Sequence, residues 1–209
     1  MELIQYLNSN FLTKQELLDI SKVTNEDFLS YQQQKLMPTY SYKLDLNITS
    51  DSFFGLHNEE QTVEYYAKGY SSWLAIIQSL KSADDVYSVF SKRYTKTIKR
   101  LQENGHSSNN PKINSELNNH IKDEWQHFLS GIYGLCTKSG LPEDIAAKEF
   151  SIIEIKELYE KIELSLKEIE KLTLAVNLLD SASSLFAPHE RLQSSRHRLI
   201  NEVRRKYKL

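Results

Sequence analysis

Residues 41–77 read SYKLDLNITSDSFFGLHNEEQTVEYYAKGYSSWLAII, and a strand pattern gives way there to a helix pattern. Tyr42, Leu44, Leu46 and Ile48 alternate with polar residues, which predicts an antiparallel strand with one face in water. A polar turn follows at residues 50–52. The acidic pair at residues 59–60 then predicts the start of a helix, because carboxylates are favoured at the positive end of the helix dipole.

The predicted helix carries apolar residues every three or four positions, which places them on one face. They are Val63, Tyr66, Ala67, Tyr70, Trp73, Leu74, Ile77 and Leu80. Gly69 lies inside this run, and a mid-helix glycine costs roughly 0.5–1 kcal/mol relative to alanine, so we expect another backbone to approach closely there. We interpret the stripe as an aromatic core that joins an N-terminal module to a helical body. The alternative is a small-molecule pocket lined by Tyr65, Tyr66, Tyr70 and Trp73, with His127 contributed by a later helix.

The composition bounds the class of protein. The 209 residues are 40% apolar and 26% charged, with six glycines and four prolines, which is typical of a mainly helical globular protein. A net charge of −2 excludes a globally basic nucleic-acid binder. The single cysteine, Cys136, forms no internal disulfide, and we expect a buried structural thiol. We see no secretory signal and no apolar run long enough to span a membrane, so the expected location is the cytoplasm.

The N-terminal segment predicts two short helices with a tight turn between them. Thr13 and Glu16 have the spacing of a capping box, and Thr24 and Asp27 repeat that spacing. Together with the strand from Tyr42, this order predicts a helix-turn-helix with a wing.

At these positions the chain resembles the N-terminal domain of MerR-type regulators. The resemblance is carried by Thr13, Glu16, Leu17, Val23, Thr24, Tyr31, Leu36, Pro38 and Tyr40. It implies a winged helix-turn-helix-like module with a short β-hairpin in residues 1–50. Together with the helical periodicity of the later segments, this predicts a mainly α fold in which an α-helical bundle in residues 51–209 follows the module. The resemblance also implies a DNA-binding transcriptional regulator.

The charge of this module departs from the MerR pattern. The basic residue expected in the second helix is replaced by residues 28–31, FLSY, and the arginines expected after Pro38 are replaced by Thr39 and Tyr40. Residues 1–45 hold four lysines against six acidic residues. Because duplex binding depends on neutralising phosphates, this balance disfavours nucleic acid and favours a protein or peptide partner for the module.

The remainder of the chain predicts amphipathic helices. A helix from Ser82 has a basic outer face, which is either a solvated surface or an anion-binding surface, formed by Lys92, Arg93, Lys96, Lys99 and Arg100. A helix from Ser115 is expected to end near Cys136. The periodic run at residues 152–179 predicts one long helix, either the spine of a bundle or a homodimer surface over residues 152–180.

His120, Glu124 and His127 share one face of the helix from Ser115. Glu124 and His127 have the Glu-x-x-His spacing that di-iron bundles use to hold metal. Such a site needs a second intact pair, and the only other one, Glu103 and His106, straddles a predicted helix end. A polar helix face explains the three residues as well, and no cofactor is predicted.

The final helix is expected to begin at Pro188, and the last 22 residues carry a net charge of about +5. Arginine guanidinium groups and hydroxyls can bind a phosphate or a carboxylate. This segment is therefore a candidate site for an anionic small molecule, and the site is formed by Arg191, Ser194, Ser195 and Arg196. Salt bridges to acidic helices would use the same arginines.

A second resemblance covers almost the whole chain. The phrases FLTKQELL, MPTYSYKL, DSFFG, YYAKGYSSWL, GIYGLC and APHERLQSSRHRLINEVRRKY are similar to a bacterial family of uncharacterised proteins described as natural-product biosynthesis proteins. This resemblance implies an accessory or binding protein of such a pathway. A small-molecule enzyme of the same pathway is the alternative, and no catalytic residue is implied. Phosphate-binding loops, dinucleotide fingerprints and nucleophile elbows are absent from the sequence.

Overall fold

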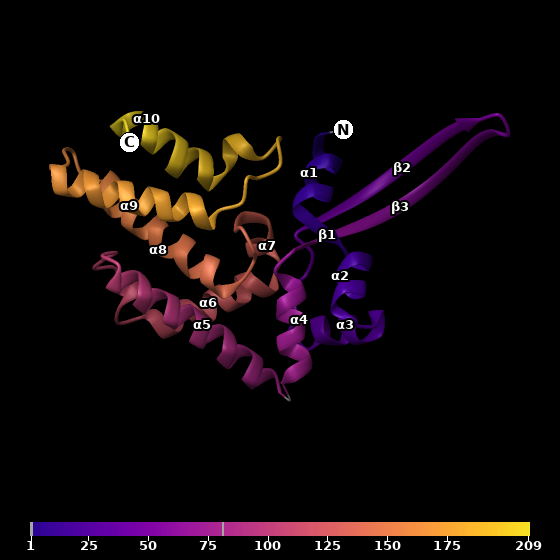
Figure 1. Ribbon diagram of the computed structural model, residues 1–209, viewed down its shortest axis with the longest axis horizontal. Helices are drawn as coiled ribbons and strands as arrows, with labels where there is room; N and C mark the ends of the chain where they lie inside the picture. The colour runs from indigo at the N-terminus through magenta and orange to yellow at the C-terminus, as the bar shows by residue number, and fades with distance from the viewer. Residues whose placement is uncertain (1, 81) are drawn as a thin grey trace.

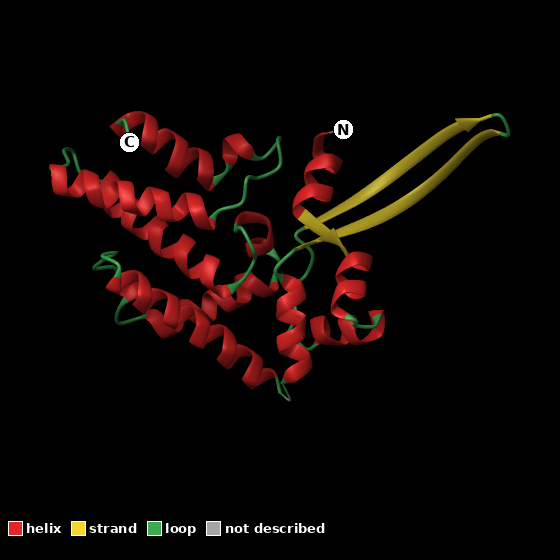
Figure 2. Ribbon diagram, viewed as in Figure 1, coloured by secondary structure: helices red, strands yellow, loops and turns green. Residues whose placement is uncertain are grey.

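The computed structural model describes residues 2–80 and 82–209. The first part contains α1 (Glu2–Asn10), β1 (Phe11–Thr13), α2 (Lys14–Ser21), α3 (Asn25–Gln33), β2 (Tyr42–Ser52) and β3 (Gly55–Ala67). The second part contains α4 (Tyr70–Ser79), α5 (Ala83–Glu103), α6 (Leu117–Leu129), α7 (Ile132–Cys136), α8 (Pro142–Tyr159), α9 (Leu166–Ala182) and α10 (Glu202–Tyr207) (Figures 1 and 2). The expected mainly helical class is therefore confirmed.

The capping signals of α2 and α3 are confirmed. The Thr13 hydroxyl accepts a hydrogen bond from the Glu16 amide at 3.3 Å, and the Glu16 carboxylate accepts one from the Thr13 amide at 2.8 Å. The Thr24 hydroxyl accepts from the Asp27 amide at 3.1 Å. These bonds satisfy amides that a helix start leaves free, so each helix begins where its cap lies.

The prediction of a helix from residue 59 is wrong, because residues 55–67 form strand β3. This strand lies between β1 and β2 in a three-stranded antiparallel sheet, with Tyr42 opposite Tyr65 and Leu44 opposite Val63. Pairing across the hairpin overrides the helical spacing, which is a weaker local preference. Helix α4 begins only at Tyr70. Position 50, the expected module boundary, lies inside β2, and the sheet continues to Ala67.

Strands β2 and β3 extend beyond the body as a two-stranded arm (Figure 1). Ser52 pairs with Gly55, so Phe53 and Phe54 form the turn at its tip. From Asn47 outward on β2, the side chains of both faces are exposed. The arm is therefore held by the body only at its base.

The aromatic stripe packs inward and joins the two parts, as predicted. Trp73 and Tyr70 are fully buried. The Trp73 ring lies 5.1 Å from the Phe128 ring of α6, and its indole nitrogen donates to the carbonyl of Leu36 at 2.9 Å. One continuous core thus runs from α2 and α3 through α4 into α5, α6 and α8.

Two positions at this junction require glycine, because another backbone segment approaches each of them closely. A Cβ on Gly69 would lie 2.4 Å from the carbonyl oxygen of Ser139, so the predicted close approach is confirmed, although Gly69 precedes α4 instead of lying within a helix. Gly131 has a φ of 82°, and a Cβ there would lie 2.4 Å from the carbonyl oxygen of Tyr40. Gly131 therefore breaks the helix predicted from Ser115 into α6 and α7.

Two further helix predictions are corrected. Residues 152–179 form the end of α8, a turn and most of α9, and their apolar residues pack on each other and on α10 within one chain. The last helix does not begin at Pro188. After a 3₁₀ turn at Arg191–Gln193, the chain enters a π-helical turn at His197–Asn201 that leads into α10. No helix in the described residues is long and apolar enough to cross a membrane.

Candidate functional sites

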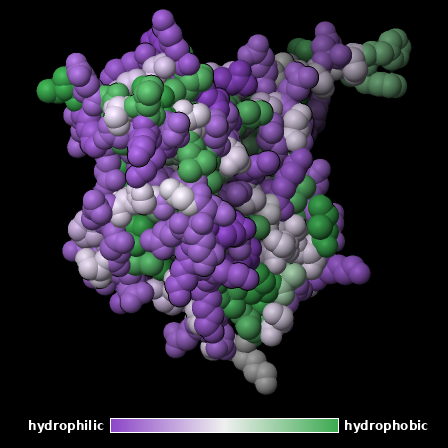
Figure 3. All heavy atoms as spheres, turned by 60° about the vertical axis from the view of Figure 1, so that its left-hand side comes forward, coloured by the Kyte–Doolittle hydropathy of each residue, from purple (hydrophilic) through white to green (hydrophobic). Residues whose placement is uncertain are grey.

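The tip of the arm exposes large apolar side chains to water. Phe53 is 97% exposed, Phe54 is 94% exposed, and Leu56 beside them is 73% exposed. The two rings meet edge to face with their centroids 5.4 Å apart. Figure 3 shows apolar side chains gathered at the end of the arm, away from the body. Projecting aromatic residues in water mark a contact site.

The arm is acidic. Residues 42–67 contain one lysine against five acidic residues, a net charge of −4. Most of these charges lie along the exposed part of the strands, and Asp51 lies two residues before the tip. A surface of this sign repels phosphate groups.

Hydrogen bonds anchor the base of the arm. The Tyr42 hydroxyl donates to the Glu190 carboxylate at 2.6 Å, and the Tyr65 hydroxyl donates to Asn8 at 2.8 Å. Burial and the neighbouring Glu190 carboxylate raise the pKa of Tyr42, which keeps its phenol protonated. The base is therefore fixed to α1 and to the C-terminal segment.

A second candidate site is a buried polar cluster centred on Glu124 of α6, called here the Glu124 cluster. His120 Nδ1 lies 3.3 Å from one Glu124 oxygen, and His127 Nδ1 lies 3.3 Å from the other. The Tyr133 hydroxyl donates to the same oxygen as His127. Tyr94 of α5 contacts His120 Nε2 at 3.2 Å. Residues of three helices, α5, α6 and α7, thus come together around Glu124.

Burial determines the electrostatics of the Glu124 cluster. Desolvation and the Glu149 carboxylate raise the pKa of Glu124 to about 7, although His127 opposes the rise. Desolvation and Lys112 lower the pKa of His120 to about 4, so its imidazole is neutral near neutral pH. The Tyr94 hydroxyl can then donate to Nε2 of the neutral His120 ring, whose Nδ1 lies 3.3 Å from Glu124.

The Glu124 cluster reaches solvent on two sides. The side chain of His127 is 57% exposed. On the other side, His120 and Glu149 line a pocket of about 280 Å³ together with Lys112 and Lys156. A carboxyl group with a pKa near neutrality beside such a pocket can give and take protons. The described residues contain no group of three or more His, Cys, Asp or Glu side chains arranged to hold a metal ion, although His120, Glu124 and His127 do lie together.

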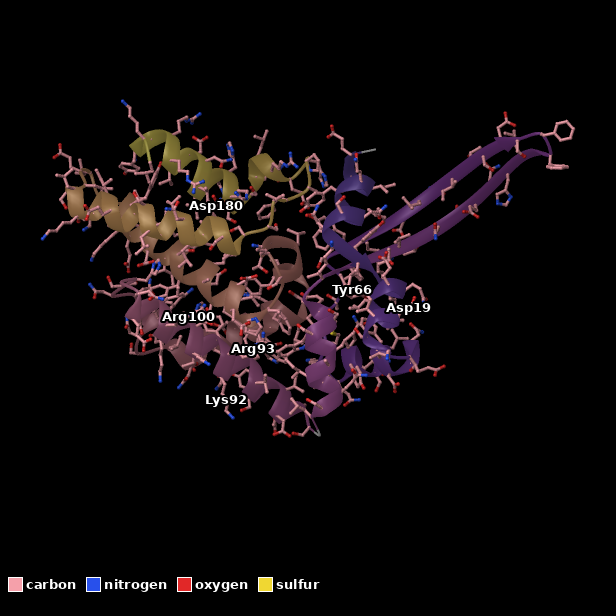
Figure 4. All side chains as sticks on the ribbon, viewed as in Figure 1. Asp19, Tyr66, Lys92, Arg93, Arg100 and Asp180 are labelled. Carbon is pink, nitrogen blue, oxygen red and sulfur yellow. The ribbon has the colours of Figure 1, made fainter. Side chains whose placement is uncertain are left out.

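The aromatic residues considered as pocket walls lie in the core. Tyr66, Tyr70 and Trp73 are at most 1% exposed, and Tyr66 packs edge to face on Phe28 at 5.4 Å. Figure 4 shows Tyr66 at the junction of the arm and the helices beneath it. His127 belongs to the Glu124 cluster instead, so the structure does not bring it together with these three rings in one cavity.

The candidate anion site near the C-terminus is held by bonds within the chain. Arg196 forms a salt bridge to Asp180 of α9 at 2.5 Å, and Arg204 contacts the other Asp180 oxygen at 2.7 Å (Figure 4). Burial opposes ionisation of Asp180, but hydrogen bonds from both arginines outweigh it and lower the pKa. Arg191 donates to the carbonyl of Phe186 at 3.2 Å.

The two serines of this site differ. The Ser194 hydroxyl donates to the Arg191 carbonyl at 2.6 Å and accepts from the His197 amide, so it caps the last helix. The Ser195 hydroxyl is buried without a partner in the described part of the chain.

The basic face of α5 is largely solvated. Lys92, Lys96, Lys99 and Arg100 are exposed, and Lys92 points away from the body in Figure 4. Arg93 differs, because it binds Glu143 through two bonds of 2.7 Å. Cys136 is half-buried, and burial raises the pKa of its thiol.

Sequence reasoning predicted a short hairpin but missed its second strand, its length and three residues around Glu124. The sequence does contain a signal for the arm, because Phe-Phe-Gly after a polar strand can form a hairpin turn with glycine at its end. Tyr94, Tyr133 and Glu149 come from three other helices, and only the packing of those helices brings them to Glu124.

The chain belongs to a family of unknown function, DUF6058, whose family model matches residues 86–208. The matched region runs from α5 to α10 and contains the whole Glu124 cluster, whereas the arm precedes it. Comparisons with curated proteins and with solved structures gave no match.

Proposed function

We propose that this protein is a cytoplasmic accessory protein of natural-product biosynthesis that binds a protein partner through the tip of its arm. One observation carries the proposal: two adjacent phenylalanines, each more than 90% exposed, lie at the end of a hairpin that projects from the body. Aromatic residues of this kind supply much of the binding energy when a partner pocket buries them.

The topology of the N-terminal part supports a winged helix-turn-helix module with the arm as its wing. The element order is α1, β1, α2, α3, β2, β3, and β3 lies in the centre of the sheet. In this proposal the module spans residues 1–67. Its acidic arm replaces the basic surface that phosphate contacts require, which supports a protein partner over duplex DNA.

Photo-crosslinking in the cells that produce the protein tests this proposal. Benzoylphenylalanine replaces Phe54 in the full chain, which keeps an aromatic ring at the tip. A matched control places the same residue at Ile162, which is fully exposed on the turn between α8 and α9. We expect one discrete protein adduct from position 54 that the control does not give.

The captured protein is then purified and titrated with the chain. Replacing Phe53 and Phe54 with serine is expected to weaken binding at least about tenfold, because buried aromatic anchors each contribute more than 1 kcal/mol. Equal adduct patterns from positions 54 and 162, or equal affinity of the serine variant, would contradict the proposal.

A second candidate function is acid–base chemistry on a small molecule at the Glu124 cluster. It is favoured by the pKa of Glu124 near 7 and by the pocket that His120 and Glu149 line. In this function the Glu124 carboxylate holds a proton that His120 passes between the buried cluster and the pocket.

Isotope-edited infrared spectroscopy tests the proton-holding role. The carboxyl band of Glu124, identified by its loss in Glu124→Gln, is expected to titrate near pH 7. The matched control is Glu143→Gln, which removes a carboxylate that pairs with Arg93 at the surface. Titration of the Glu124 band in the ordinary carboxyl range, near pH 4, would remove this candidate.

A further inference from the structure

A pocket of about 340 Å³ lies at the base of the arm, between the N-terminal module and the helical body. Tyr6, Phe11 and Ala67 form its wall on the module side, and Leu185 and the stem of Arg196 form part of the other side. Leu185 is 57% exposed at this site. Tyr6, Phe11 and Ala67 are buried, so Leu185 supplies most of the apolar surface that the chain leaves open at this pocket.

One buried polar group in this pocket is unsatisfied within the described residues. The Ser183 side chain is 5% exposed, lines the pocket, and its hydroxyl has no hydrogen-bond partner. An unpaired buried hydroxyl destabilises the chain that contains it. Ser183 Oγ is closed to solvent in the free chain, so a docked turn with a free backbone carbonyl supplies the missing partner once the Ser183 side chain rotates toward the pocket.

We propose that the aromatic tip of the arm docks into this base pocket on a second copy of the chain, and that the second copy returns the same contact. The inference rests on the proposed function of the arm as a docking element, and it names the occupant. Phe53 and Phe54 of one copy pack against the apolar wall of the pocket on the other copy. The backbone carbonyls of the same turn face Ser183 of that other copy.

The length of the arm fits a reciprocal contact. Strand β2 has 11 residues, which span roughly 36 Å at about 3.3 Å per residue. A two-fold axis midway along two antiparallel arms places each tip at the base of the other. The same two patches then meet twice, so the assembly closes as a dimer and leaves no tip exposed.

The marginal stability of an isolated hairpin also supports burial of the arm. A two-stranded hairpin with both faces in water is marginally stable at best, and both of its outer edges offer unpaired backbone groups. Contact with a second copy covers the apolar tip and orders the strands. An arm that served no contact would gain nothing from its length.

The charges are complementary. The arm carries −4, whereas the last 22 residues, which border the base pocket through Arg196, carry about +5. Asp180 already neutralises Arg196, but Lys138 is exposed and lines the pocket. Asp51 beside one tip can therefore meet Lys138 of the second copy. The like charges of the two arms disfavour edge-to-edge pairing of their strands, so the contacts between copies lie at the tips and the bases.

Sedimentation equilibrium of the purified full chain tests the inference. We expect the wild type to form dimers. Replacing Phe53 and Phe54 with serine is expected to raise the dimer dissociation constant at least about tenfold. The matched control Ile162→Ser removes an equally exposed apolar residue away from the arm and is expected to leave that constant unchanged.

Crosslinking then identifies the contact. Benzoylphenylalanine at position 54 of the purified chain is expected to give a dimer whose adduct maps to residues 134–138 or 181–185. A dimer with the adduct elsewhere, a wild type that remains monomeric, or serine variants that dimerise like the wild type would overturn the inference. If the purified chain is monomeric but position 54 captures a different protein in cells, the second copy is excluded and the proposed function stands. If neither experiment gives an adduct, both fail.

Discussion

At the level of single residues, Glu124 and His120 affect stability in opposite directions as the pH changes. The folded protein holds the Glu124 proton up to about pH 7, whereas an unfolded glutamate loses it near pH 4.5. Stability therefore falls with rising pH between these values. Folded His120 gains its proton only near pH 4 instead of 6.5, so its contribution to stability rises with pH over that interval.

Removing Glu124 should expose the contribution of His120. In Glu124→Gln, we expect the free energy of unfolding to rise by roughly 3 kcal/mol between pH 4 and pH 6.5, because each tenfold change in proton affinity corresponds to 1.36 kcal/mol. His120→Asn should show the reverse, a fall from pH 4.5 to pH 7. Urea unfolding at a series of pH values measures both slopes.

The charged neighbours Lys112, Asp123, His127 and Glu149 remain in both variants. Parallel pH profiles for the two variants would contradict the opposing effects of Glu124 and His120, because only the shared neighbours could then explain the slope.

Gly69 is a second residue whose environment leads to a direct prediction. A Cβ there would lie 2.4 Å from a backbone oxygen of Ser139. We expect Gly69→Ala to lower the free energy of unfolding by about 1–3 kcal/mol, because backbone on both sides must shift. Gln78→Ala on the exposed side of α4 should change it by less than about 0.5 kcal/mol. Chemical denaturation compares the two, and equal effects would count against the close approach.

At the level of elements, local signals were sufficient for some segments and not for others. The caps of α2 and α3 were readable because Thr13 and Thr24 bond to amides only three residues away. Strand β3 was misread because the spacing of Val63, Tyr66 and Tyr70 also fits a helix. Its pairing with β2, which no local pattern contains, decides the conformation. The break between α6 and α7 depends on a contact of Gly131 with Tyr40, which lies 91 positions earlier in the sequence.

The candidate sites, too, could be predicted only where their residues lie close together in the sequence. His120, Glu124 and His127 could be aligned from spacing alone because they share one helix. The residues that complete their environment, Tyr94 and Glu149, lie on α5 and α8. Tertiary packing alone brings Tyr94 to His120 and brings Glu149 close enough to raise the pKa of Glu124.

The exposed tip of the arm predicts that substitutions there weaken binding but leave the stability of the monomer unchanged. Replacing Phe53 and Phe54 with serine should leave the free energy of unfolding of the monomer within about 0.5 kcal/mol, because both side chains are already in water. Phe28→Ala in the core should lower it by about 3–5 kcal/mol. Urea denaturation at low protein concentration measures both. A large loss in the serine variant would mean that the tip packs on its own body.

At the level of the whole molecule, the shared core predicts one cooperative transition. The residues around Trp73 come from the N-terminal module and from the helical body, so the main hydrophobic core is shared between the two parts. Far-ultraviolet circular dichroism and tryptophan fluorescence should report the same midpoint in urea. Trp73→Phe should shift both midpoints together, whereas two separated transitions would show that residues 1–67 fold independently.

The charge distribution predicts that duplex DNA is not the partner. Fluorescence anisotropy with random-sequence duplexes should show no binding that declines steeply with salt. If such binding were found and were weakened by Lys92→Glu, Lys96→Glu and Arg100→Glu, the regulator implied by the MerR resemblance would be favoured over an accessory protein.

Hydrogen–deuterium exchange of the arm is the most direct measurement of whether the arm is a docking element. Amides in residues 46–62 should be protected at high protein concentration and should exchange quickly on dilution. In the variant with serine at positions 53 and 54 they should exchange quickly at every concentration. Protection that is equal in the variant and the wild type, and independent of concentration and of any added partner, would contradict the account.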